Sequence, residues 1–177
     1  MADNLVIYYS RSGTTREAAE MLGARLGWPV VELRDAVSRV GWWGDMRCVW
    51  DNRLRRKVGY RYDGPPLATC DNVVVMAPVW VEHLAAPMRS FLLDQRPYAG
   101  RLAAIAVMAS RGGFRAAEEV AMAMGRPPHP AMVLLQRDVT NGEARGDLDA
   151  FASILQRETG AGTEGGSRSA WLSPAEA

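Results

Sequence analysis

The apolar positions of the chain predict buried strands that alternate with amphipathic helices. Five short segments are rich in consecutive apolar residues, which is typical of strands covered on both faces of a parallel sheet. These segments are residues 5–9, 29–33, 72–77, 102–109 and 131–135. Between them, apolar residues recur every three to four positions, which is the spacing of one helix face.

Four such stripes predict four helices. Gly27 and Gly125 directly follow two of the stripes and are expected to end those helices. Pro87 is tolerated in its helix only near the start. The stripes consist of Thr15, Ala18, Leu22 and Leu26; Leu84, Met88, Phe91 and Leu92; Ala117, Val120, Ala121 and Met124; and Leu148, Phe151, Ala152 and Leu155.

The repeated alternation of strand and helix predicts an α/β fold in three layers, with a doubly wound, parallel, five-stranded sheet between the helices. A length of 177 residues suits one domain, which we place at residues 1–158. Residues 36–67 form an irregular, Arg- and Trp-rich excursion with weak periodicity. Residues 159–177 are predicted to be a flexible tail, in which Trp171 and Leu172 are able to dock.

Composition and charge limit the kinds of binding partner that we expect. The formal net charge is +1, from 21 basic and 20 acidic residues, so no strong field favours nucleic acid or a membrane surface. No segment approaches the ~20 apolar residues of a membrane helix, and the N-terminus lacks the basic region of a signal peptide. Cys48 and Cys70 are not spaced as a CxxC pair, which indicates reduced thiols and no metal site. We therefore expect a cytoplasmic protein.

The loop after the first strand has the features of a phosphate site. The side chains of Ser10, Ser12, Thr14 and Thr15 surround Gly13, where a helix is expected to begin. The first N–H groups of a helix lack intrahelical partners and carry partial positive charge. The loop lacks both dinucleotide-type glycine spacing and the lysine of a triphosphate loop, which favours a single monophosphate. The alternative is that Ser12 only caps the helix and Gly13 only turns the chain.

Two other loops are expected at the same edge, because ligands of open α/β sheets bind beyond the carboxyl ends of the strands. The first of these follows the third strand and contains Pro78, Val79 and Trp80. The second follows the fourth strand and contains Ser110, Arg111, Gly112 and Gly113. The three loops together predict one shared binding site.

The order of these loops resembles that of flavodoxin-like proteins. Ser10-Arg11-Ser12-Gly13-Thr14-Thr15 is similar to their phosphate loop, Ser/Thr-x-Ser/Thr-Gly-x-Thr. Pro78-Val79-Trp80 resembles the loop after the third strand of flavodoxin-like oxidoreductases, and Ser110-Arg111-Gly112-Gly113 resembles their Gly-Gly loop. The resemblance covers residues 5–155 and implies the sheet order 2-1-3-4-5 with noncovalently bound FMN.

The resemblance also implies a role for each loop. The first loop would hold the ribityl phosphate, and the other two would flank the isoalloxazine ring. Trp80 would offer an aromatic face to that flat ring, although a tryptophan that fills the core beneath a loop is the alternative. Gly112 and Gly113 would let the backbone approach the ring because no Cβ intervenes, and a plain turn is the alternative.

The expected activity follows from where the chain departs from the electron-carrying flavodoxins. Its charge is near neutral, its second loop reads Ala-Pro-Val-Trp, and its third loop has no tyrosine. It is therefore more similar to flavodoxin-like reductases, which implies electron transfer from NAD(P)H to a small acceptor such as a quinone. Two alternatives stay open: an electron-transfer module that acts with a redox protein partner, and a flavin-less binding or regulatory protein.

The region around residues 47–57 mixes cations with aromatic side chains. It is compatible with a clamp for a nicotinamide phosphate or an anionic acceptor, and equally with a solvated helix packed on the sheet. Trp42, Trp43, Tyr60 and Tyr62 either cover the site, fill the core or form a homo-oligomer contact.

Two histidines complete the candidates. His83 follows the second loop and is a candidate for a catalytic proton donor, with a purely structural histidine as the commoner alternative, and Glu82 has the same status. His129 lies between prolines and is expected to be an ordinary loop residue. The sequence offers no carboxylate pair, Ser-His-Asp set or metal-ligand cluster, so hydrolytic and metal chemistry are not expected.

Overall fold

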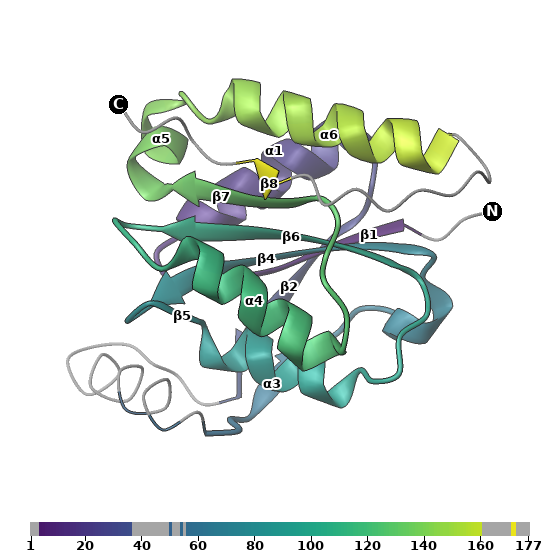
Figure 1. Ribbon diagram of the computed structural model, residues 1–177, viewed down its shortest axis with the longest axis vertical. Helices are drawn as coiled ribbons and strands as arrows, with labels where there is room; N and C mark the ends of the chain where they lie inside the picture. Colours follow the sequence, from purple (N-terminus) through teal and green to yellow (C-terminus); the bar gives the residue numbers. More distant parts are fainter. Residues whose placement is uncertain (1–3, 37–49, 51–53, 55, 161–170, 173–177) are drawn as a thin grey trace.

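The computed structural model describes residues 4–36, 50, 54, 56–160 and 171–172. Its centre is a twisted, mostly parallel sheet between two layers of helices, as Figure 1 shows. The predicted α/β class and the three-layer arrangement are therefore confirmed.

The five predicted strands form the middle of the sheet. They are β1 (Asn4–Tyr9), β2 (Val30–Asp35), β4 (Asn72–Trp80), β6 (Arg101–Met108) and β7 (Ala131–Leu135). All are parallel to their neighbours, in the order β2-β1-β4-β6-β7. Counted as the five predicted strands, this order is 2-1-3-4-5.

The sheet is larger than the five strands expected, with eight in the described residues. Strand β3 (Tyr60–Tyr62) pairs antiparallel with β2, and β8 (Trp171–Leu172) pairs parallel with β7. Strand β5 (His83–Leu84) folds back antiparallel on the end of β4. Strands of two or three residues are too short to show a periodic pattern, so the sequence did not reveal them.

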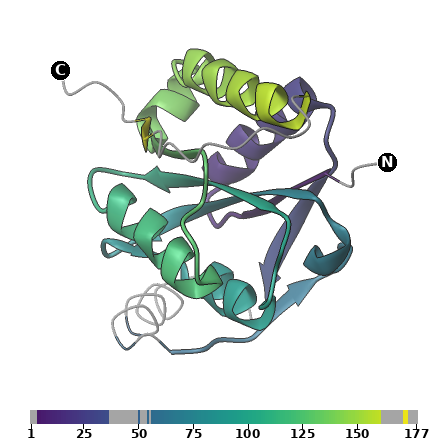
Figure 2. The same ribbon diagram turned by 45° about the vertical axis from the view of Figure 1, so that its right-hand side comes forward.

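Two helical layers cover the sheet. Helices α1 (Thr14–Leu26), α5 (Gln136–Asn141) and α6 (Arg145–Gly160) lie on one face, and α3 (Ala86–Asp94) and α4 (Gly113–Met124) lie on the other (Figures 1 and 2). A short 3₁₀ turn, η1 (Leu67–Thr69), precedes β4. Gly27 and Gly125 end α1 and α4 in the left-handed conformation, as predicted.

The core has two halves, one on each face of the sheet. In β1, Leu5 and Ile7 face the half covered by α3 and α4, whereas Val6 and Tyr8 face the half covered by α1 and α6. Both sets are buried, which explains why the strands read as apolar runs instead of alternating patterns.

Some predictions were wrong in detail. Pro78, Val79 and Trp80 do not break the third strand but form its last three residues. Leu84 belongs to β5 and not to a helix, and α3 begins at Ala86, with Pro87 in its first turn. Helix α5 was not expected, since its six residues bury only Val139.

Several predictions fall on residues outside the described ranges. Most of the segment 36–55 lies outside them, including Trp42, Trp43 and Cys48, as do most of residues 47–57, for which a solvated helix was considered, and most of the tail. Helix α6 continues to Gly160, two residues beyond the proposed end of the domain. Among the described residues, no helix combines the length and the apolar character needed to cross a bilayer.

Candidate functional site

The three predicted loop segments lie at one edge of the sheet. Strands β1, β4 and β6 are parallel neighbours, and their carboxyl ends point the same way. The first loop joins β1 to α1, residues 78–80 end β4, and the third loop joins β6 to α4. This edge is where open α/β sheets bind ligands.

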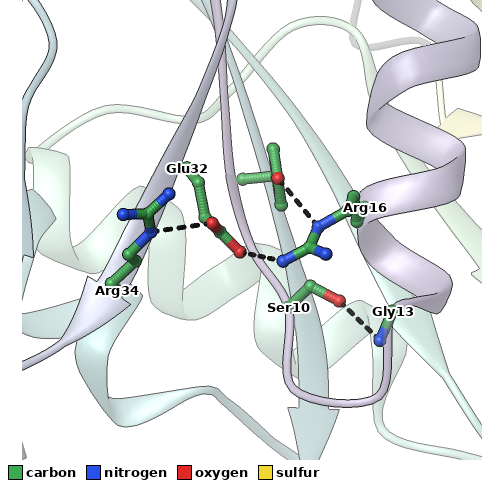
Figure 3. Close-up of polar contacts among 6 residues, drawn as sticks. Ser10, Gly13, Arg16, Glu32 and Arg34 are labelled. Carbon is green, nitrogen blue, oxygen red and sulfur yellow. Dashed lines mark hydrogen bonds and ion pairs between the residues drawn. The ribbon is translucent and has the colours of Figure 1, made fainter.

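The first loop is built around Gly13, which has φ 96° and stands at the N-cap of α1. The hydroxyl of Ser10 accepts a hydrogen bond from the Gly13 N–H at 3.1 Å, and Figure 3 shows this contact. The first intrahelical bond runs from the Glu17 N–H to the Gly13 carbonyl at 2.9 Å. The N–H groups of Thr14 and Thr15 precede that bond and are therefore donors available at the helix N-terminus.

The alternative that Ser12 caps the helix is wrong. Gly13 occupies the cap position, and none of the described side chains forms a capping hydrogen bond there. The Ser12 hydroxyl lies 3.5 Å from the Thr14 hydroxyl on the exposed side of the loop, and the Thr15 side chain is buried. The exposed hydroxyl groups of Ser12 and Thr14 therefore do not cap the N-terminus of α1.

Arg16, in the first turn of α1, is a feature of this site that the sequence reasoning missed (Figure 3). Its guanidinium donates to the Tyr8 hydroxyl at 3.1 Å and to Glu32 at 2.6 Å. Arg34 donates to the other oxygen of Glu32 at 2.8 Å. An arginine in a first helical turn opposes the helix dipole, and this unfavourable placement was a usable signal.

The carboxylate of Glu32 compensates for the positive charge of Arg16. Its partial burial on β2 raises the pKa of the carboxyl, but the hydrogen bonds from Arg16 and Arg34 outweigh burial and leave the pKa below its ordinary value. The carboxylate therefore stays ionised at neutral pH, and the Arg16 side chain is held against β1 and β2 beside the loop.

The second loop segment ends in a tight hairpin. Trp80 pairs with His83 across β4 and β5, and the two residues between them, Val81 and Glu82, have φ of 51° and 64°. Two positive φ values in a two-residue hairpin define a type I′ turn, which normally contains Asn and Gly. A β-branched valine in this conformation is strained.

Glu82 connects this hairpin to the third loop. Its carboxylate lies 3.0 Å from Arg111 Nε and 4.0 Å from Arg115 Nη1. Gly112 has φ 94°, and a Cβ built on it would lie 2.5 Å from the Glu82 Cα. The glycine is therefore required because two backbone segments touch at this position.

The hairpin and the third loop line an open-sided cavity of about 440 Å³, which is within the usual range for a small-molecule site. Three of the predicted cofactor residues, Val79, Ser110 and Arg111, line it, as does His83. Trp80 packs edge-on against Tyr9, with ring centroids 5.3 Å apart. The full lining consists of Val79, Val81, Glu82, His83, Ala109, Ser110, Arg111 and Arg115.

His83 is joined to a buried carboxylate that the sequence reasoning did not consider. Its Nδ1 lies 2.5 Å from Glu119 Oε1, and the other oxygen of Glu119 accepts the Leu84 N–H at 3.1 Å. Glu119 lies on α4 among Ala116, Val120 and Ala123, which are all buried. A glutamate on the apolar face of a helix was the signal that would have found it.

Comparison with known proteins shows which solved structures have a similar fold. No family model and no curated protein sequence matches the chain. Among solved structures, a flavoprotein in complex with FMN from Lactobacillus acidophilus superposes with a TM-score of 0.66 at 18% identity, over 80% of this chain and 98% of that one. A WrbA-like flavodoxin from Agrobacterium tumefaciens gives 0.53 at 15% identity, over 89% and 99%.

A third match is the apo form of an NADH:FMN oxidoreductase, with a TM-score of 0.56 at 14% identity over 89% of this chain and 90% of that one. These sequence identities are too low to assign an activity to this chain, but the alignments cover nearly the whole length of each neighbouring structure. Together with the strand order, they show that the chain has the flavodoxin-like fold.

Proposed function

We propose that this protein binds FMN and passes electrons from NAD(P)H to a small acceptor such as a quinone. The observation that carries the proposal is the pairing of two features at one edge of the sheet. One is the hydroxyl-rich N-terminus of α1, and the other is the 440 Å³ cavity lined by the hairpin and the third loop. The FMN in the Lactobacillus acidophilus flavoprotein supports the same cofactor.

The first loop fits a phosphate. Thr14 and Thr15 offer N–H donors at a helix N-terminus, and Ser12 and Thr14 hold exposed hydroxyl groups at the same point. Ser10 supports the turn through Gly13. Together with Arg11, these residues are proposed to bind the ribityl phosphate of FMN.

The cavity fits the other end of the cofactor. Val79, Ala109 and Ser110 supply apolar and hydrogen-bonding surface there, and Gly112 keeps the third loop close to the hairpin, while Gly113 lies against Val133 and Met108. When bound, FMN supplies both one- and two-electron transfer. The roles proposed for Pro78 and Trp80 beside the ring stay predictions, since Trp80 packs on Tyr9 in this structure.

The first test is FMN binding by the purified full chain, followed by fluorescence quenching. We expect Ser12→Ala and Thr14→Ala each to weaken binding by about 1 kcal/mol or more, because each removes a hydroxyl proposed to form a hydrogen bond to a charged group. Ser153→Ala is the matched control, since its hydroxyl donates to the Asp149 carbonyl on α6, away from this edge. Failure to bind excess FMN contradicts the proposal.

The second test identifies the electron donor. Under anaerobic conditions, NADH or NADPH is expected to bleach the bound flavin, and a quinone is expected to restore its colour. Bleaching only by a protein reductase instead supports the electron-transfer module. The net charge of +1 favours the small-molecule reductase, because a carrier that docks on redox proteins benefits from a strong surface field.

A further inference from the structure

A buried carboxylate beneath the cavity has no part in the function proposed above. Glu119 on α4 is only 2% exposed. Burial of a charged carboxylate is costly unless it is hydrogen-bonded. Glu119 satisfies this requirement with the Leu84 N–H at 3.1 Å and His83 Nδ1 at 2.5 Å, and Arg89 Nη1 lies 4.0 Å behind it.

These contacts determine how His83 is oriented. The two ring nitrogens of an imidazole lie on different edges, and a carboxylate on one of them selects the proton position and leaves the other for a ligand. In His83, Nδ1 is bound to Glu119, whereas the residue itself lines the 440 Å³ cavity with 13% of its side chain exposed. Its backbone is fixed by the pairing of β5 with β4.

We propose that Glu119 is a positioning residue that holds His83 with its proton on Nδ1, and that Nε2 exchanges a proton with a carbonyl-bearing acceptor that binds in the cavity beside the flavin ring. The proton transfer from Nε2 rests on the proposed function. The reduction of a quinone-type acceptor needs a hydride, which bound and reduced FMN would supply, and a proton, which Nε2 of the imidazolium would give. The N–H bond breaks, an O–H bond forms on the acceptor, and water restores the proton to the neutral ring.

The charges near this pair come from several elements. Glu82 on the β4–β5 turn, Arg111 in the third loop and Arg115 on α4 line the same cavity, and Arg89 on α3 lies behind Glu119. Glu82 already faces the two cavity arginines. Glu119 is thus the carboxylate that the structure places directly on the ring of His83.

The chain contains its own control, because it has only two histidines. His129, before β7 at the opposite edge of the sheet, also contacts a glutamate, but through the other nitrogen. Its Nε2 lies 2.8 Å from Glu158 Oε1, and the two side chains are 38% and 31% exposed. The two carboxylates therefore contact different ring nitrogens, Nδ1 in His83 and Nε2 in His129.

The first experiment measures the tautomers of both histidines in the full chain without flavin, by long-range ¹H–¹⁵N NMR at a pH where both rings are neutral. We expect the Nδ1–H form for His83 and the Nε2–H form for His129. Glu119→Gln is expected to abolish the single Nδ1–H form of His83, whereas Glu158→Gln leaves His83 unchanged. An Nε2–H tautomer at His83 in the unsubstituted protein overturns the proposal.

The second experiment uses His83→Asn, whose amide N–H replaces Nδ1 as donor to Glu119 but has no counterpart of Nε2. With FMN in saturating excess, we expect quinone turnover to fall about 100-fold, as for a lost proton donor, with a flattened pH profile. His129→Asn serves as the control. Wild-type turnover and an unchanged pH profile in His83→Asn contradict the proton-transfer role.

The two proposals fail in different ways. If the protein does not bind FMN, the proposed function is wrong, and the tautomer of His83 still decides whether Glu119 positions the ring. If FMN binds and is reduced but His83→Asn behaves as the unsubstituted protein, only this inference is wrong.

Discussion

The junction between β1 and α1 and the junction between β6 and α4 use the same backbone device for different ends. Each has a glycine at the N-cap, with φ of 96° at Gly13 and 94° at Gly112. In each, the carbonyl of that glycine accepts the first intrahelical bond, at 2.9 Å from Glu17 and 3.0 Å from Ala116. The two junctions thus begin as near copies.

They differ in what surrounds the glycine. A Cβ on Gly13 would meet no described atom within 4 Å, whereas a Cβ on Gly112 would lie 2.5 Å from the Glu82 Cα. The first junction is open at this point, whereas the second packs against the β4–β5 hairpin. The same left-handed glycine therefore begins both helices, and the residues around it determine whether the position is open or packed against another backbone segment.

Gly112→Ala is expected to have the largest effect. The substitution adds left-handed strain and a backbone clash with Glu82, so we expect the free energy of unfolding to fall by about 3 kcal/mol. Urea denaturation of the full chain measures this. A loss equal to that of Gly13→Ala would show that the contact with Glu82 relaxes at no cost, and the comparison would break.

Gly13→Ala comes next. It adds only left-handed strain, which costs about 1 to 2 kcal/mol, and FMN affinity is expected to fall because the loop must shift. Gly146→Ala on α6 is the matched control, since its Cβ meets no described atom within 4 Å and no positive φ is required there. That control is expected to be neutral or slightly stabilising.

Val81→Asn tests the β4–β5 hairpin, against which the second junction packs. Asparagine accepts a positive φ far more readily than valine, so relief of strain in the type I′ turn is expected to raise the free energy of unfolding by about 1 kcal/mol. Thermal denaturation detects the change. A destabilised variant would mean that the exposed Val81 side chain makes packing contacts that outweigh its strain.

Glu32→Gln is expected to have the smallest effect and concerns only the first junction. The folded-state pKa of Glu32 lies below its ordinary value of 4.5, so its ion pairs stabilise the protein fully above that pH. This contribution is lost as the pH falls through the lower, folded-state pKa. Below pH 4.5, the difference in stability between Glu32→Gln and the unsubstituted protein is expected to shrink, as measured by urea titrations at stepwise lower pH.

The sequence by itself determined the parts of this protein that follow from local pattern. Strands buried on both faces leave uninterrupted apolar runs, so the five central strands were predicted close to their observed bounds. Gly27 and Gly125 were identified as helix ends because only glycine adopts the left-handed conformation without cost. The turn at Ser10–Thr15 was placed correctly at the start of a helix, and its role as a phosphate site stays a prediction that rests on the positive end of the helix dipole.

The tertiary structure alone decided the features that depend on contacts between distant residues. Strand β4 continues through Pro78 because β6 pairs alongside it, as the register of Pro78 with Val107 shows. The pairing of His83 with Glu119 spans 36 positions, and the contact of Gly112 with Glu82 spans a helix and a strand. Local periodicity records which face of an element is buried, but it carries no information about which residue of another element lies opposite.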